Sequence, residues 1–428
     1  MTRKRDDRKT ITAWALYDFA NSAYITLIVT FIFNSYFTRR IAADPTDGTV
    51  LWTWGGVATS AAIVGVMSPF LGAMADYSGR KKPFLLFFTA LCAVCTALLF
   101  TVKPGEVVAA LVLFVLANIG FEAANVFYNA FLPEISTKET IGRVSGIGWA
   151  TGYAGGLICM AIALGMIQSW IPKSGDLNVR ATNLLAAGWY ALFAIPIFLF
   201  VRETPRNEGL SAAELIRVGV RRLSTTFHQL RAFREAAKLL IASLVYSNGL
   251  TVVFSLAAIY AAAAFGMTQT EVLMLGLWLN VVAGIGAFSF GFVNDRIGGK
   301  KTIAISLVGL IVATLMGAIA QSRAMFWIAS TLLGIMVGPN QAASRSLLGV
   351  LIPENKHAEA FGFYAFSGKT SSIIGPILYG LILQVTRNQR FAMASVVIFF
   401  VVGLVVLTTI DEKRGIALAD EASRVSSP

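Results

Sequence analysis

The stretch GAMADYSGRKK, Gly72–Lys82, occurs a second time in the chain as GFVNDRIGGKK, Gly291–Lys301. Glycine, aspartate and lysine stand at matching positions of the two copies, which lie 219 residues apart. Each copy separates two long apolar runs, so each is predicted to be a short polar turn between two membrane helices. Further along, FLPE ending at Glu134 is matched by LIPE ending at Glu354. Halves that repeat in register are typical of a duplicated fold, so the sequence predicts two similar bundles.

The composition is that of a membrane protein, because 56% of the residues are hydrophobic and only 14% are charged, against about a quarter charged in soluble domains. Helical runs of about 20 apolar residues cross a bilayer, and their continuous rather than alternating pattern excludes a β-barrel. The predicted fold is all-α, with about twelve transmembrane helices in two pseudo-symmetric six-helix bundles. The predicted spans are Ile11–Phe37, Leu51–Ala75, Pro83–Val102, Glu106–Phe131, Arg143–Trp170, Leu184–Val201, Lys238–Phe265, Glu271–Val293, Thr302–Ala320, Ala324–Leu348, Glu359–Gln384 and Arg390–Ile410.

The net charge of +12 is concentrated in alternate loops, which predicts topology rather than nucleic-acid binding. Both termini and the middle segment are predicted to lie in the cytoplasm, and the chain to contact membrane lipids. The predicted domains are residues 1–201, a cytoplasmic linker at 202–237, and residues 238–428. Within the linker, apolar residues from Ile216 to Phe233 recur at helical spacing between arginines, which predicts a basic amphipathic helix on the membrane surface.

The sequence carries no pattern of catalysis or metal binding. The three cysteines lie inside predicted spans, and His228 and His357 are too isolated to form a metal site. No catalytic triad, phosphate loop or metal-hydrolase signature is present. The sequence therefore predicts no enzyme, no cofactor and no metal site, and no cleavable signal peptide is expected.

The two repeated turns, each after the second span of a six-span half, resemble the major facilitator superfamily. The strings WALYDFANSAY (Trp14–Tyr24) and FYNAFLPEI (Phe127–Ile135) are similar to the branch that includes the fungal vacuolar amino-acid effluxer and its bacterial relatives. The turns depart from the superfamily pattern, since Tyr77 replaces the usual arginine and Gly299 the first basic residue of the second copy. The resemblance implies a monomeric transporter whose first, fourth, seventh and tenth spans line a central cavity. It also implies that contacts of the turns hold the cytoplasmic side shut.

A gating role for the turns also follows from their chemistry. Asp76 can accept hydrogen bonds from the amides at the start of a neighbouring helix, and the basic residues after it can pair with acids such as Glu134. Topology alone is the alternative, and it would explain the cations but not the glycines and the aspartates. The gating candidates are Gly72, Asp76, Gly79, Arg80 and Lys81 in the first turn, and Gly291, Asp295, Arg296, Gly298 and Lys300 in the second.

Three ionisable residues are predicted to lie about 10–15 Å inside the membrane, at a cost that usually requires a cavity or a partner. They are Asp18, Glu122 and Lys369. Arg345 lies closer to the end of its span and is interpreted as reaching the membrane surface. Asn118, Glu122, Asn125 and Asn129 form one helix face. Polar side chains complete the binding candidates, with hydrogen bonds between spans as the alternative role: Asn21, Tyr24, Asn248, Asn340 and Gln341.

The function predicted from the sequence is secondary active transport of a small polar solute by alternating access. A zwitterionic amino acid suits the charges, because Asp18 or Glu122 can bind its ammonium group and Lys369 its carboxylate. One of the carboxylates is the alternative carrier of a coupling proton. Export of another metabolite or drug, and a receptor that uses the fold without transport, stay open. The expected location is a bacterial inner membrane.

Gly148, Gly152 and Gly156 predict close helix packing on the fifth span.

Overall fold

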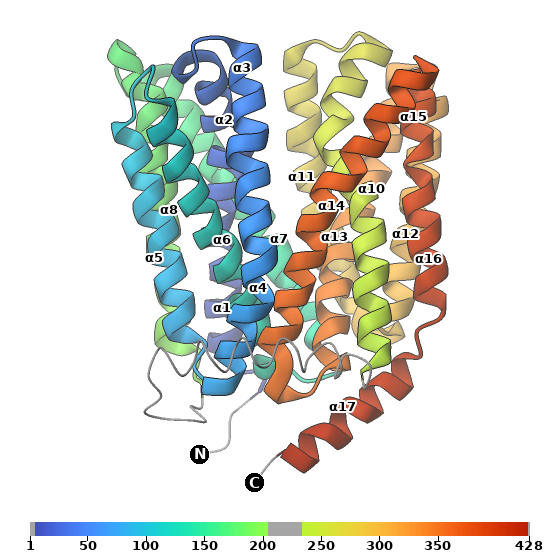
Figure 1. The fold of residues 1–428 in the computed structure, drawn as a ribbon. Helices are drawn as coiled ribbons and strands as arrows, with labels where there is room; N and C mark the ends of the chain where they lie inside the picture. The colour runs from blue at the N-terminus through green and yellow to red at the C-terminus, as the bar shows by residue number, and fades with distance from the viewer. Residues whose placement is uncertain (1–4, 204–232, 427–428) are drawn as a thin grey trace.

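The computed structural model describes residues 5–203 and 233–426, and nearly all of these residues are helical (Figure 1). The predicted linker helix lies outside the described residues. The helices form two bundles side by side, one from each half of the chain. The N-terminal half contains α1 (Arg8–Ala23), η1 (Tyr24–Phe31), α2 (Phe33–Tyr36), η2 (Phe37–Ile41), α3 (Pro45–Val50), η3 (Leu51–Ala58), α4 (Thr59–Ser78), α5 (Lys82–Leu98), η4 (Leu99–Thr101), α6 (Val107–Ile135), α7 (Ile141–Gly165), η5 (Met166–Trp170), η6 (Ser174–Asp176) and α8 (Leu177–Phe200).

The C-terminal half follows the same plan and ends in an additional helix outside the bundle. Both termini and both repeated turns lie at one end of the molecule, which we call the termini end (Figure 1). The C-terminal elements are α10 (Arg234–Phe265), α11 (Gln269–Ile297), α12 (Gly299–Ile319), α13 (Arg323–Leu351), η7 (Glu354–Lys356), α14 (His357–Thr386), α15 (Gln389–Ser395), α16 (Val397–Thr408) and α17 (Glu412–Ser426).

Within the described part of the chain, ten helical segments are long and apolar enough to cross a membrane. The long helices α13 and α14 are not among the ten, although they contain 29 and 30 residues. The run of Asn340, Gln341 and Arg345 lowers the hydropathy of α13. When α13 and α14 are added to the ten segments, the described residues contain twelve long helices, as many as the spans predicted from the sequence.

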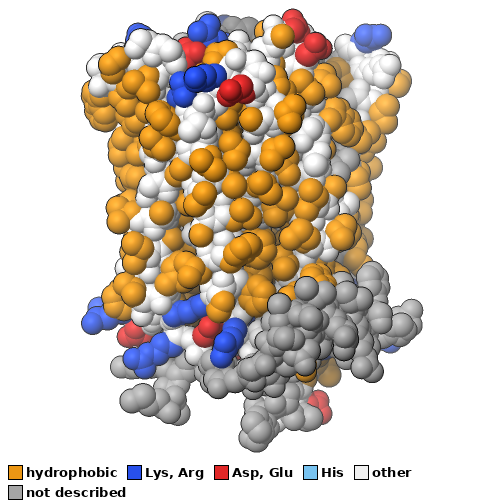
Figure 2. Space-filling model, turned by 60° about the vertical axis from the view of Figure 1, so that its left-hand side comes forward, with side chains coloured by type: hydrophobic (Ala, Val, Ile, Leu, Met, Phe, Trp, Pro, Cys, Tyr) orange, Lys and Arg blue, Asp and Glu red, His pale blue; other side chains and the backbone are white. Residues whose placement is uncertain are grey.

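The surface fits a membrane environment. Figure 2 shows a broad area of hydrophobic side chains across the middle of the face in view, with Lys, Arg, Asp and Glu gathered at its two ends. Large apolar side chains of the long helices are well exposed, for example Val66, Val108 and Val385. Exposed apolar surface of this extent is stable only in contact with lipid or a partner, so this area is the bilayer-facing surface.

Glycines bring the two halves into backbone contact near the termini end. A Cβ atom on Gly72 of α4 would lie 2.2 Å from the carbonyl oxygen of Ala358 on α14. A Cβ atom on Gly146 of α7 would lie 2.4 Å from the carbonyl oxygen of Ala287 on α11. Because small residues let helices approach closely, these contacts join α4 to α14 and α7 to α11. The described structure is therefore closed at the termini end.

Candidate solute site and gating contacts

The aspartate of each repeated turn lies at the start of a helix in the other half. Asp76 accepts hydrogen bonds from the backbone amides of Ala358 (3.1 Å) and Glu359 (2.7 Å) at the start of α14. Asp295 accepts one from the amide of Arg143 (3.1 Å) at the start of α7. A carboxylate at this place satisfies amides that have no partner within their helix and interacts favourably with the helix dipole. The predicted helix cap by Asp76 is thus present, and it crosses between the halves.

The other residues of the turns form contacts mostly with their own half of the chain. Lys81 forms an ion pair with Glu134, as predicted, and its Nζ lies 3.8 Å from Asp76. Glu203 accepts from the amides of Lys81 and Lys82, both at 2.8 Å.

The second turn repeats this arrangement, because Glu412 accepts from the amides of Gly299 (2.9 Å) and Lys300 (3.1 Å). Gly79 and Gly298 end their helices with positive φ angles of 68° and 91°, which glycine tolerates best. Arg80 and Arg296 are exposed.

Replacing Asp76 by Asn is expected to weaken closure at the termini end. The amide side chain keeps one acceptor but loses the charge, so a charge-assisted hydrogen bond of about 1.5–3 kcal/mol is lost. Ile141 offers a reporter position, because it is 5% exposed and its Cδ1 would lie 3.1 Å from a Cβ atom added to Gly349 of the other half. In an Ile141→Cys background, Asp76→Asn should raise maleimide labelling from the termini end.

The matched control is Asp44→Asn, which alters another helix cap within one half, where Asp44 accepts from Thr46 (2.7 Å) and Asp47 (3.1 Å). Unchanged labelling in Asp76→Asn at normal expression would leave topology as the role of the turn.

Arg345 does not extend to the membrane surface, and this part of the sequence interpretation is wrong. The residue is 3% exposed, and its guanidinium enters the N-terminal half. It donates to Asp18 Oδ2 (3.1 Å), Asn129 Oδ1 (3.2 Å), Ser145 Oγ (2.9 Å) and the Ser145 carbonyl oxygen (2.7 Å). In this position, polar groups of three other helices, α1, α6 and α7, replace water around the guanidinium of Arg345.

Aromatic rings complete the surroundings of this guanidinium. Its central carbon lies 4.9 Å from the ring centre of Trp14, 5.5 Å from that of Trp149 and 5.8 Å from that of Tyr128. Aromatic faces attract cations at these distances. We call Trp14, Tyr128 and Trp149 the aromatic cage, and all three belong to the N-terminal half.

Gly148 leaves the space that Arg345 and Asp18 occupy. A Cβ atom there would lie 2.7 Å from Asp18 Oδ2, 2.7 Å from Trp14 Cζ3 and 2.9 Å from Arg345 Nη2. Gly148→Ala should therefore displace the ion pair and lower the thermal unfolding midpoint. Gly188→Ala is the control, since nothing lies within 4 Å of its added Cβ. Equal midpoints for the two variants would contradict the close fit.

A second ion pair joins the halves further from the termini end. Lys369 Nζ of α14 donates to Glu122 Oε1 of α6, and the two side chains keep 21% and 16% exposure. Glu122 lies 13 residues before the end of α6 at Ile135, or about 20 Å along the helix. Lys369 lies 12 residues after the start of α14, or about 18 Å. Both lie further from the helix end than predicted, because α6 and α14 extend beyond the predicted spans.

Polar side chains on the same faces of α6 and α13 are only partly buried. Between residues 117 and 133 of α6, Glu122, Asn125 and Asn129 alone are not buried. On α13, Gln341 alone is not buried between residues 337 and 349, and it accepts from the Tyr153 hydroxyl of α7 (3.1 Å). Asn21 is buried, and it supports this face by donating to Asn125 (3.2 Å). Glu122, Asn125, Asn129 and Gln341, with Lys369, form the candidate solute site, whereas Asp18 is paired with Arg345.

Comparisons with known proteins identify the family of this chain. A family model described as "Vacuole effluxer Atg22 like" matches residues 56–420. The chain belongs to the Atg22-like family of major facilitator transporters. It is 29% identical over 407 residues to the uncharacterized MFS-type transporter YxiO of Bacillus subtilis, with 94% of each chain covered. It is 26% identical to autophagy-related protein 22 of Kluyveromyces lactis, covering 78% of this chain and 74% of the relative.

Solved structures show the same fold at low sequence identity. The human organic anion transporter MFSD10 matches with a TM-score of 0.76 and 12% identity, over 94% of this chain and 100% of the other. The transporter FucP in its outward conformation matches with a TM-score of 0.68 and 16% identity, over 94% and 98% of the two chains. The Atg22-like chain is thus a multi-pass membrane transporter of this superfamily.

Several polar candidates of the Atg22-like chain lie inside one half instead of at the candidate solute site. Asn118 donates to Ser60 (2.8 Å), and Asn340 donates to Ser306 (3.0 Å). Both are buried. On the predicted helix face of α6, Asn118 is thus separated from the partly exposed Glu122, Asn125 and Asn129, and it joins α6 to α4. Asn248 is also buried, and it donates to the Leu244 carbonyl oxygen of its own helix (2.6 Å).

Tyr24 is 1% exposed and packs against Phe121. Its ring therefore supports the wall of the candidate solute site rather than lining it.

Sequence reasoning missed Tyr153, Ser145 and the role of Arg345. A signal for Arg345 was present, because it follows Gln341 by four residues and so shares its helix face. Ser145 and Tyr153 carried no distinguishing pattern.

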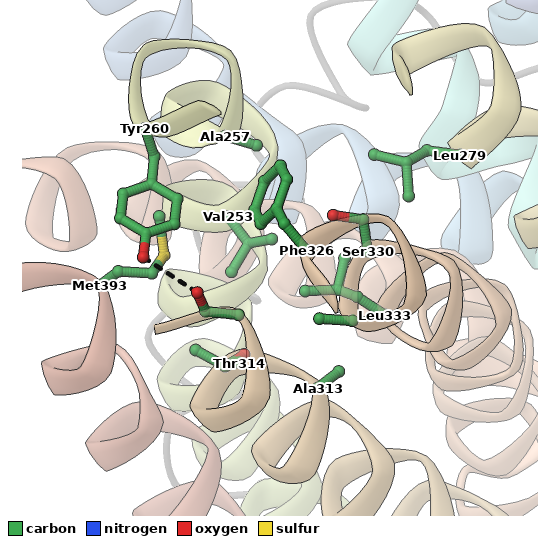
Figure 3. Close-up of a pocket in the computed structure, with 12 residues that line it drawn as sticks. Val253, Ala257, Tyr260, Leu279, Ala313, Thr314, Phe326, Ser330, Leu333 and Met393 are labelled. Atoms are coloured by element: carbon green, nitrogen blue, oxygen red, sulfur yellow. Dashed lines mark hydrogen bonds between the residues drawn. The ribbon is translucent and has the colours of Figure 1, made fainter. Parts of the chain in front are cut away.

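A small apolar cavity in the C-terminal half of the Atg22-like chain is separate from these charges. It measures about 40 Å³ and is surrounded by Val253, Tyr260, Leu279, Thr314, Phe326 and Leu333, among others (Figure 3). The dashed line in Figure 3 is the hydrogen bond from the Tyr260 hydroxyl to the Gly317 carbonyl oxygen (3.0 Å). Its size and lining suit neither a polar solute nor an ion.

Proposed function

We propose that this transporter moves a small zwitterionic solute, an amino acid, by alternating access, and that Glu122 and Lys369 bind it. The observation that carries the proposal is their ion pair: one acid and one base from opposite halves, about 18–20 Å along their helices from the termini end and partly exposed. A zwitterion carries the complementary charges, an ammonium group for Glu122 and a carboxylate for Lys369. The resemblance to the vacuolar amino-acid effluxer branch supports the same solute class.

In the absence of solute, Glu122 and Lys369 neutralise each other, which lowers the cost of two charges in the membrane. A zwitterion replaces this pair by two new pairs and remains in contact with both halves. Asn125 and Asn129 add donors and acceptors along the same face of α6. Because the solute bridges the halves, its binding can be coupled to their rocking motion.

We also propose that the termini end faces the cytoplasm of a bacterial cell, as the basic loops predict. The described conformation would then be closed to the cytoplasm, and the protein would act as a monomer in the inner membrane. A coupling proton is proposed to bind Glu122, because neutralising this carboxylate would release Lys369.

The test is solute counterflow in proteoliposomes, with the purified protein and a set of radiolabelled amino acids and other small metabolites. Saturable exchange of at least one zwitterionic amino acid is expected. Exchange of anions or uncharged drugs only would overturn the solute class. A full absence of flux, with a correctly folded protein, would favour a receptor on the same fold.

A further inference from the structure

We propose that the aromatic cage with Asp18 is a second binding site, for an organic cation with a guanidinium or primary ammonium group, and that Arg345 fills it while the termini end is closed. The inference rests on alternating access as proposed above. The site would take its cation from the termini end, once the halves separate and α13 withdraws Arg345.

The first observation is that the site belongs to one half and its present occupant to the other. All the hydrogen-bond partners of Arg345 named above, and the three rings of the cage, lie in the N-terminal half. The guanidinium therefore sits in the N-terminal half as a bound cation would. Gly148 provides the room on one side of it.

The second observation is that two walls of the cage, Trp14 and Tyr128, are held in place without Arg345. The indole nitrogen of Trp14 donates to the Tyr128 carbonyl oxygen (3.0 Å), and the two rings stack with centres 4.7 Å apart. Tyr128 stacks on its other face against Tyr17 (4.8 Å), whose hydroxyl is hydrogen-bonded to Thr89 (2.6 Å) and Tyr190 (2.8 Å). All these contacts are internal to the N-terminal half. Trp14 and Tyr128 can therefore keep their positions when the halves part.

The third observation is the charge that Asp18 carries in a nearly buried position. Asp18 keeps only 14% side-chain exposure, and its cationic partner Arg345 is 4% exposed. Withdrawal of Arg345 would leave the carboxylate unpaired at this depth, which is unfavourable in a membrane. A cation that enters the cage restores the pairing and the cation–π contacts together. A proton on Asp18 restores the charge balance but leaves the three rings without a cation.

The test uses the purified full-length Arg345→Ala variant, which vacates the site in every conformation, titrated with ethylguanidinium chloride by calorimetry. Saturable binding is expected. The double variant Asp18→Asn with Arg345→Ala should bind at least tenfold more weakly, and wild type should bind weakly because its own arginine competes. Ethylurea, a neutral analogue, is the control ligand and should not bind.

Equal affinity of the single and double variants, or equal binding of ethylurea, would overturn the site. No binding to Arg345→Ala would also overturn it and leave a proton as the partner of Asp18. If Arg345→Ala does not fold, Asp76→Asn serves instead: weakened closure should make it bind ethylguanidinium more tightly than wild type, and equal affinities would refute the proposal. Glu122→Gln in the Arg345→Ala background should keep ethylguanidinium binding, so failure of the proposed transport site and failure of the cage are separable.

Discussion

Glu122→Gln is expected to reduce solute transport more than tenfold, which corresponds to about 1.4 kcal/mol or more in binding. The glutamine keeps the size of the side chain but cannot pair with an ammonium group, and it leaves Lys369 without its partner. If Glu122 instead carries only the coupling proton, gradient-driven accumulation should vanish while solute exchange persists, because exchange needs no net protonation cycle. Both activities are measured in the same proteoliposomes.

Lys369 provides the comparison that separates binding from stability. Lys369→Gln alone should lower transport and thermal stability together, since it leaves Glu122 unpaired. Combining Glu122→Gln with Lys369→Gln removes both charges, so stability should recover while transport stays low. Glu139→Gln, at an exposed loop position, is the control. Recovery of transport in the double variant would show that the pair only holds the halves together.

Arg345→Ala is expected to open the termini end to a larger degree than Asp76→Asn. Removing one partner of a buried ion pair typically costs about 3–5 kcal/mol, because the remaining charge is uncompensated. Here the loss also includes the contacts to Asn129 and Ser145, all of which cross between the halves. Maleimide labelling of Ile141→Cys should therefore rise strongly. Cys92, Cys95 and Cys159 are buried, so background labelling should be low.

The matched control is Arg323→Ala, which removes another arginine of the same helix. Arg323 binds Glu271 (2.9 Å) and the carbonyl oxygens of Phe265 (3.0 Å) and Gly266 (2.8 Å), all in its own half. Its loss should destabilise α13 locally without opening the termini end. Similar labelling in both variants would mean that Arg345 stabilises its helix rather than the closed conformation.

The contacts that join the halves lie at different distances from the termini end. The Asp76 cap lies at the helix start of α14, and the pair of Glu122 and Lys369 lies about 18–20 Å further in. The contact proposed for solute binding and the contact proposed for closure therefore involve the same helix, α14, at two different positions. A solute that displaces Lys369 would act on the helix that Asp76 caps, and this gives binding a direct mechanical connection to closure.

Features that depend on local spacing were predictable from the sequence. The apolar runs determine the spans, the repeat determines the two bundles, and Gly79 with Asp76 determines a turn that ends one helix and can cap another. The face shared by Glu122, Asn125 and Asn129 also follows from helical periodicity, and these three remain partly exposed. Each of these inferences uses residues close together in the chain, where helix geometry fixes the relative positions.

Only the tertiary structure decided which charges meet. Lys369 and Glu122 are 247 residues apart, and Arg345 and Asp18 are 327 residues apart. Hydropathy gives the depth of a residue in the membrane, but not the neighbour that its helix face meets. Asn118 shows the difference, because it lies on the same face as Glu122 yet is buried against Ser60 of α4. The rotation and packing of whole helices, which depend on the sum of many contacts, determined that Arg345 enters the other half rather than reaching the surface.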